Sequence, residues 1–337
     1  MKRKRALRRA VAAAVAAAFV AAILVIDLFV CPFSLLSARA GAPDIPPRGE
    51  NELRIHFLDV GQGDCTVIEF PGGESMLVDG GDGSASHVRA AVGYCLALGI
   101  DTFDRMLLTH PDEDHAGGLA ELLRTFGAEK IYLPFRSAAE GEEKYAEFIA
   151  GAEASGAELL HAQTLLPLLP EGETGSCFGL FLSPFSPEIR PLPEEDNDAS
   201  AVLYLEYAGR RLLMTGDASA AVEEEIADAW MLSGGAAFAC PLPSGRLLVP
   251  DLAALDFLKA GHHGSSASTG TELAALCAPK QLFISCGAGN SYGHPGLTAM
   301  ENVLAQVPDA GIWRTDELGN IMLTVRADGS YDIRAVG

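Results

Sequence analysis

The sequence predicts an α/β fold in which two β-sheets pack face to face with helices outside, an αββα sandwich preceded by one N-terminal apolar helix. Strand-like segments are followed by helix-like segments in two successive halves of the chain, the order expected of two covered sheets. The 337 residues, 49% of them hydrophobic, also suffice for one large core. We therefore expect one domain over residues 53–337 rather than two.

The first 40 residues differ from the rest of the chain. A basic start precedes an almost unbroken apolar run over residues 10–26, which is interrupted at Asp27 and resumes over residues 28–36. This pattern is typical of an export signal or a membrane anchor. The small-x-small triplet at residues 38–40 suits cleavage, whereas a run close to the roughly 20 residues that span a bilayer favours an uncleaved anchor. Both interpretations place the bulk of the chain outside the cytoplasmic membrane, tethered to its extracellular side or secreted.

A linker containing Pro and Gly, residues 41–52, leads into the first half of the domain. Three strand-like segments separated by Gly-containing turns predict an antiparallel meander, at residues 53–60, 65–70 and 75–78. Helix-like and strand-like segments then alternate: helix 88–98, strand 103–109, helix 118–126, strand 130–133 and helix 142–154.

The second half repeats this order. Apolar runs predict strands at residues 178–182, 201–207 and 211–214. Alternating segments follow: helix 220–231, strand 257–259, helix 271–277, strand 281–285, helix 297–307, and strands near residue 312 and over 321–325.

A dense polar cluster follows the strand predicted at 103–109. His110, Asp112, Asp114 and His115 fall within six residues, and each side chain is able to ligate a cation. These groups are too close together to share a dry core without a positive partner. The Gly-Gly pair at 117–118 lets the backbone approach closely. We interpret the cluster as a metal-binding loop, with a solvated acidic loop as the alternative.

Two further polar groups stand at the ends of apolar strands. Asp217 follows the run at 211–214, where one carboxylate is able to bridge two cations; capping of the next helix is the alternative. The adjacent His262 and His263 offer one ring to a metal and the other to a neighbouring group or substrate. The sequence leaves open which ring is the ligand.

Other polar residues have weaker signals. His294, in a Gly-His-Pro loop, is a candidate to protonate a leaving oxygen or bind a phosphate, and a loop-fixing hydrogen bond is the alternative. Asp59, Asp64 and Asp79 lie in turns at strand ends, where Asp is common, and are expected at most to support the ligands.

Together these motifs resemble the extracellular metallo-β-lactamase-like domain of the ComEC competence proteins. The spacing of the first loop is similar to the His-x-His-x-Asp-His signature of the metallo-β-lactamase superfamily, with Asp112 in place of the second His. A full competence protein joins this domain to a multi-helix membrane channel, whereas at most one spanning segment is expected here. The matching segments are DVGQGD at 59–64, DGG at 79–81, THPDEDH at 109–115, NDAS at 197–200, TGD at 215–217, KAGHHGS at 259–265, GNSYGHP at 289–295 and RTDE at 314–317.

The resemblance implies the metallo-β-lactamase fold and a metal-dependent hydrolase. It also implies a ligand in the acidic turn before strand 201–207, where the superfamily often supplies a His and this chain offers Asn197 or Asp198. One cation would then be held by His110, Asp112 and one of these two residues. The other would be held by Asp114, His115 and either His262 or His263, with Asp217 between the two cations.

Two cations about 4 Å apart bind a water and lower its pKa, so the expected nucleophile is a bound hydroxide. Asp114 and His294 are the expected catalytic residues. Asp112 in place of a His raises the oxygen content of the site and favours manganese, although zinc also accepts carboxylates.

The charge of the chain bears on its substrate. The formal net charge is −21, and because seven of the 24 Lys and Arg lie in the first 40 residues, the remainder is more acidic still. Such a surface repels polyanions and slows their encounter. The leading hypothesis is a hydrolase of phosphodiesters, DNA among them. The alternatives are a hydrolase of a small ester, lactone or cell-wall phosphoester, and a non-catalytic metal-bound surface binding module.

Overall fold

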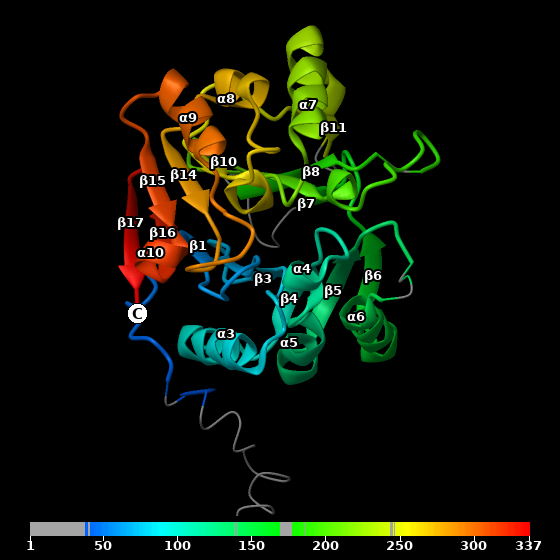
Figure 1. Ribbon diagram of the computed structural model, residues 1–337, viewed down its shortest axis with the longest axis vertical. Helices are drawn as coiled ribbons and strands as arrows, with labels where there is room; N and C mark the ends of the chain where they lie inside the picture. Colours follow the sequence, from blue (N-terminus) through cyan, green and yellow to red (C-terminus); the bar gives the residue numbers. More distant parts are fainter. Residues whose placement is uncertain are drawn as a thin grey trace, which may run out of the picture.

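Two mixed β-sheets pack face to face at the centre of the computed structural model (Figure 1). The structure describes residues 38–39, 41–137, 139, 141–168, 177–185, 187–242, 245 and 247–337. One sheet has eight strands in the order β17-β16-β1-β2-β3-β4-β5-β6, and the other has seven in the order β15-β14-β13-β10-β9-β8-β7.

The eight-stranded sheet begins with the predicted antiparallel meander, β1 (Leu53–Phe57), β2 (Thr66–Glu69) and β3 (Ser75–Val78). Three strands then continue parallel to β3: β4 (Phe103–Leu107), β5 (Ala128–Leu133) and β6 (Glu158–His161). The end of the chain returns to this sheet, where β16 (Asn320–Val325) pairs with β1 and β17 (Tyr331–Val336) forms the edge. The intervening helices are α3 (Ala85–Leu98), the single-turn α4 (Glu113–Ala116), α5 (Leu119–Phe126) and α6 (Glu143–Ser155).

The seven-stranded sheet repeats this design. Its antiparallel part is β7 (Pro167–Leu168), β8 (Cys177–Ser183), β9 (Val202–Tyr207) and β10 (Arg210–Met214). Parallel to β10 run β13 (Phe257–Lys259), β14 (Gln281–Ile284) and β15 (Gly311–Arg314). The helices are α7 (Ala220–Ser233), α8 (Thr271–Cys277), α9 (Leu297–Gln306) and α10 (Thr315–Leu318), with short turns η1 (Asn197–Ala199), η2 (Ala236–Phe238) and η3 (Gly261–Gly264) and a hairpin of β11 (Cys240–Pro241) and β12 (Leu247–Leu248).

Three apolar layers hold the sandwich together. One lies between the eight-stranded sheet and α3, α5 and α6, and another between the seven-stranded sheet and α7, α8 and α9. The third lies between the two sheets, where Phe57 of β1 stacks on Phe283 of β14 with ring centroids 4.4 Å apart. Because each sheet is covered on both faces, its strands read as apolar runs. The predicted αββα sandwich is confirmed.

The predicted N-terminal apolar helix falls on residues 1–37, which lie outside the described residues. Ala38, just after this segment, is buried against the layer beneath α3. Within the described ranges, no helix combines the length and the apolar character needed to cross a bilayer. The six cysteines in these ranges are free thiols, and all of them are buried.

Candidate metal centre

The polar clusters predicted from the sequence lie in the loops that follow the carboxyl ends of β4, β10, β13 and β14. These ends are brought together because β10, β13 and β14 are adjacent parallel strands and β4 faces them from the other sheet. Loops at the carboxyl ends of parallel strands are the usual place for a site in α/β folds. Ligand-type side chains from both sheets therefore converge on one place.

The centre of the site is formed by His115, His263 and two carboxylates. Nε2 of His115 lies 3.3 Å from Nε2 of His263. Asp217 lies beside both, with Oδ1 3.2 Å from Nε2 of His115 and Oδ2 3.3 Å from Nε2 of His263. Oδ2 of Asp114 is 3.2 Å from Nε2 of His263. Of the His262–His263 pair, His263 therefore points its ring into the cluster.

Neighbouring groups orient the imidazole rings. Nδ1 of His115 donates a hydrogen bond to Asp79 at 2.8 Å, and Nδ1 of His263 donates to the backbone carbonyl of Ser285 at 2.9 Å. With the proton held on Nδ1, Nε2 presents its lone pair to the centre. An acceptor behind a ligating histidine is the common arrangement in metal sites.

His110 is oriented in the same way. Its Nδ1 lies 3.0 Å from the hydroxyl of Thr109, whose own proton is donated to Asp79. The hydroxyl therefore accepts from the ring and leaves Nε2 of His110 free. That nitrogen and Oδ1 of Asp217 are buried atoms without a hydrogen-bond partner among the described residues. Burying unpaired polar atoms is costly, and a cation bound between them removes the cost.

Asp217 also lies near His110 and His262, which belong to the predicted site of the other cation. Its Oδ2 lies 4.0 Å from Nε2 of His110 and 3.7 Å from Nε2 of His262. Asp112 approaches from the solvent side, with Oδ2 3.7 Å from Nε2 of His110. These distances are longer than those from Asp217 to His115 and His263. Asp217 nevertheless lies between the ligands predicted for one cation and those predicted for the other.

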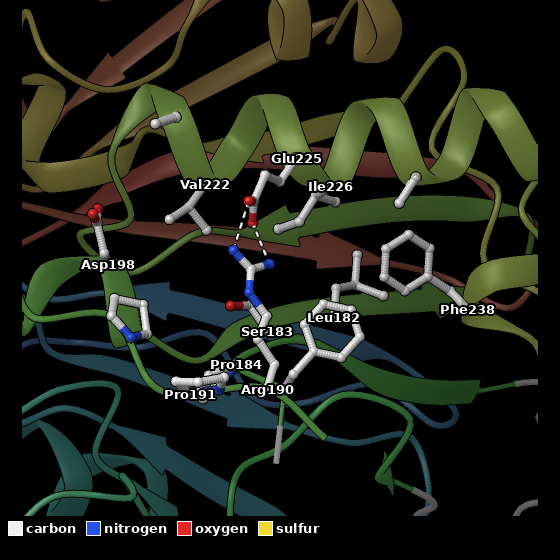
Figure 2. Close-up of a pocket in the computed structure, with 14 residues that line it drawn as sticks. Leu182, Ser183, Pro184, Arg190, Pro191, Asp198, Val222, Glu225, Ile226 and Phe238 are labelled. Carbon is white, nitrogen blue, oxygen red and sulfur yellow. Dashed lines mark hydrogen bonds and ion pairs between the residues drawn. The ribbon is translucent and has the colours of Figure 1, made fainter. Parts of the chain in front are cut away.

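The two residues of the acidic turn behave differently. The side-chain nitrogen of Asn197 lies 3.5 Å from Nδ1 of His262. Asp198 instead lines a separate pocket of about 450 Å³ beside α7, in which Arg190 pairs with Glu225 (Figure 2). Within the described residues, Asn197 is therefore the member of this turn that contacts a predicted ligand.

Asp64 is close to the cluster, but its short ion pair is with Lys259. Asp64, His115, Asp217 and His263 offer ligand atoms within 4.8 Å of one another. However, Asp64 faces the Nδ1 side of both rings, and its Oδ2 is 2.5 Å from the ammonium of Lys259. We therefore assign Asp64 to the support of the rings. The sequence analysis included Lys259 only in the matching segment 259–265 and gave it no role, although a Lys inside the apolar strand β13 signals a buried ion pair.

The charged groups of the cluster shift one another's pKa values strongly. Burial favours the neutral form of Asp217, but the charges of His263 and His115 outweigh burial and hold its pKa well below the usual value. Burial lowers the pKa of His115, yet Asp217 and Asp79 raise it well above the usual value. Burial likewise opposes the charge of Lys259, whose pKa is raised by Asp64. The cluster therefore keeps its carboxylates ionised, as a cation site requires.

His294 lies on the open side of the centre. Its ring centroid is 5.3 Å from that of His262 and 6.0 Å from that of His263. Burial, followed by the charges of His262 and His263, lowers the pKa of His294. Its Nδ1 is buried without a hydrogen-bond partner among the described residues, so one ring nitrogen is available to a ligand.

The chain is similar to several known proteins. A family model described as "Metallo-beta-lactamase superfamily" matches residues 58–287. The chain is 27% identical over 292 residues to ComE operon protein 3 of Bacillus subtilis, covering 82% of this chain and 34% of that protein. It is 27% identical over 253 residues to Recombination protein 2 of Haemophilus influenzae, covering 74% and 26%. The chain thus spans about a third or less of these curated relatives. The metallo-β-lactamase fold protein YhfI from Bacillus subtilis has a solved structure with 12% identity and a TM-score of 0.46, covering 83% of this chain and 99% of that one.

Proposed function

Because the chain belongs to the metallo-β-lactamase superfamily, we propose that it is a hydrolase with two divalent cations that cleaves phosphodiester bonds. The observation that carries the proposal is the convergence of Nε2 of His115 and Nε2 of His263 on Asp217, with Nε2 of His110 nearby. Three ring nitrogens within 4.0 Å of one buried carboxylate are a donor set that suits a metal centre.

The charge of the cluster supports two cations. Five carboxylates gather here, and the lysine that pairs with them is Lys259, so four negative charges remain for two divalent ions to balance; the carboxylates are Asp64, Asp79, Asp112, Asp114 and Asp217. One ion fits among Asp114, His115 and His263, and the other among His110, Asp112 and His262, with Asp217 shared. The carboxylate-rich donor set suits manganese, and the imidazoles also suit zinc.

When bound, such cations supply the Lewis acidity that lowers the pKa of an attacking water and stabilises charge on the phosphate. The protein's own groups have defined tasks around that chemistry. Asp79 and Ser285 hold the rings of His115 and His263 in place. Asp114, partly exposed, joins the cluster to the solvent side, and His294, with its ring 6.0 Å from that of His263, is our candidate to protonate the leaving oxygen.

The substrate class rests on the names of two relatives, Recombination protein 2 of Haemophilus influenzae and Competence protein ComA of Neisseria gonorrhoeae, because recombination and competence are processes that handle DNA. A specific observation favours the second candidate, a small ester, lactone or cell-wall phosphoester. An open hollow of about 620 Å³ borders Asp112 and Asp114, and its wall carries further carboxylates with Lys144 as its basic side chain; these carboxylates are Asp82, Glu113, Glu142 and Glu143. Such a wall repels a long polyanion.

The proposed location is the outer side of the cytoplasmic membrane, reached through residues 1–40 as an anchor or a cleaved signal. The basic start followed by the apolar run supports this part of the proposal. Protease accessibility of the domain in intact cells tests it, and protection of the domain would contradict it.

The activity is tested on the full chain loaded with Mn²⁺ or Zn²⁺, using labelled single-stranded DNA and bis(p-nitrophenyl) phosphate. Cleavage of both, abolished in Asp114→Ala, is the expected result. Cleavage of the small substrate alone supports the second candidate. Tight metal binding without turnover of either substrate supports the third, a surface binding module, and contradicts the hydrolase.

A further inference from the structure

An exposed aromatic ring stands at the mouth of the candidate metal centre. Tyr292 is 71% exposed and lines the same hollow as Asp112 and Asp114. One face of the ring is backed by His294, with centroids 5.9 Å apart and ring planes 25° apart. His294 in turn is stacked near His263, 6.0 Å away. A row of rings therefore leads from a predicted metal ligand to Tyr292.

The loop that carries Tyr292 is held firmly. The side-chain oxygen of Asn290 accepts hydrogen bonds from the backbone nitrogens of Tyr292 and His294, and its nitrogen donates to the carbonyls of Gly287 and His294. Gly287 is tied to Gln62 of the first turn. The exposure of Tyr292 is thus part of an ordered loop, which limits the entropy lost when a ligand stacks on it.

The hollow that Tyr292 lines has the size of a small-molecule site, and its lining includes acidic residues at the start of α6. Glu142 and Glu143 disfavour a second phosphate at that position, whereas an uncharged planar group meets no such penalty. A flat ring also gains from contact with an aromatic side chain whatever its hydrogen-bonding edge. The acidic lining and the exposed ring of Tyr292 together favour a neutral planar group.

We propose that Tyr292 is a stacking platform for an uncharged planar group of the substrate, a nucleobase, attached to the phosphate that the metal centre holds. This inference rests on the proposed phosphodiester function, which it makes more specific. It assigns the hollow to the terminal nucleoside of a strand or to a small nucleotide ester.

The test is calorimetric titration of the full chain in Mn²⁺ with thymidine 5′-monophosphate and with 2-deoxyribose 5-phosphate, which lacks the base. The wild type is expected to bind the nucleotide more tightly than the sugar phosphate. Tyr292→Ala should weaken nucleotide binding about tenfold, equal to about 1.4 kcal/mol, and leave sugar phosphate binding unchanged.

Two control variants accompany it. Tyr292→Phe keeps the stacking surface and should bind like the wild type. Leu297→Ala removes another exposed apolar side chain, which follows the same loop, and as a control it should also bind like the wild type. The inference is overturned if the wild type does not distinguish the two ligands, or if Tyr292→Ala affects both equally. Discrimination by the wild type without phosphodiester cleavage would instead overturn the proposed function and leave the stacking site in place.

Discussion

Nε2 of His115 and Nε2 of His263 lie 3.3 Å apart although 148 residues separate them in the chain. When each ring is neutral and its Nδ1 is the donor, as in a metal-bound histidine, these two nitrogens face each other through their lone pairs. The spacing is close to the roughly 3.3 Å between two imidazole nitrogens that share a tetrahedral zinc ion at about 2.0–2.1 Å from each. This spacing is the one expected if the two rings ligate one cation.

Replacing Asp217 by Asn should remove metal from both halves of the centre, because this carboxylate lies between them. The expected result is a fall from two ions per chain to one or none, measured by elemental analysis after dialysis. Asp332→Asn, at an exposed ion pair with Arg334, is the matched control and should keep both ions. Full retention of metal by Asp217→Asn would contradict the shared-ligand assignment.

Replacing Asp79 by Asn should weaken metal binding without removing a ligand. Asp79 accepts hydrogen bonds from His115 and Thr109, so its loss frees the ring. Loss of such an orienting partner typically costs 10–100-fold in metal affinity, which chelator competition measures. The exposed Asp59, also at a strand end, accepts only a bond from the nitrogen of Gly61 among the described contacts, and Asp59→Asn should bind metal normally.

Lys259→Met should destabilise the fold by about 3–5 kcal/mol, because it leaves Asp64 buried without its ion-pair partner. The double variant Lys259→Met with Asp64→Asn removes the unpaired charge and should recover most of the loss. Lys280→Met breaks an ion pair in which the lysine is half exposed, and should cost about 1 kcal/mol or less. Urea unfolding measures all three, and equal losses for both lysines would refute the buried pair.

The stability of the chain should depend on pH through Glu223 of α7. Burial raises the pKa of this carboxyl to about 7, against an ordinary value of 4.5, even though one oxygen accepts a hydrogen bond from the nitrogen of Gly270. Its contribution to stability is therefore fully present below pH 4.5 and is lost as the pH rises through 7.

Glu223→Gln lacks this titration. The difference in free energy of unfolding between the variant and the wild type should move in favour of the variant by about 2–3 kcal/mol from pH 5 to pH 8. The exposed neighbour Glu224 gives the control Glu224→Gln, for which the difference should stay constant. A pH-independent difference for Glu223→Gln would show that the buried carboxyl does not titrate in this range.

Most of the fold was predictable because the strands are covered on both faces and read as apolar runs. Two of the strands that were missed, β6 and β17, are the edges of the eight-stranded sheet. β6 has exposed side chains at three of its four positions, and β17 has one buried residue, its last, with no apolar run. Their pairing is decided by the neighbouring strand and not by their own sequence.

The site was predictable only as a set of residue types at strand ends. The choice between His262 and His263 depends on ring direction, which is set by left-handed backbone at both residues and by the carbonyl of Ser285. Neither the left-handed backbone nor the contact with Ser285 can be inferred from the sequence. The pairing of Lys259 with Asp64 joins two sheets across 195 positions of numbering, and no local pattern specifies such a contact.

His115 and His263, whose rings meet at the centre, belong to opposite halves of the chain. A bound ion would therefore affect the stability of the fold as well as the chemistry of the site. An ion held by both would act as a removable cross-link, closing a long loop of chain much as a disulfide does. Such an ion could be held by both rings only after the chain has been synthesised past residue 263.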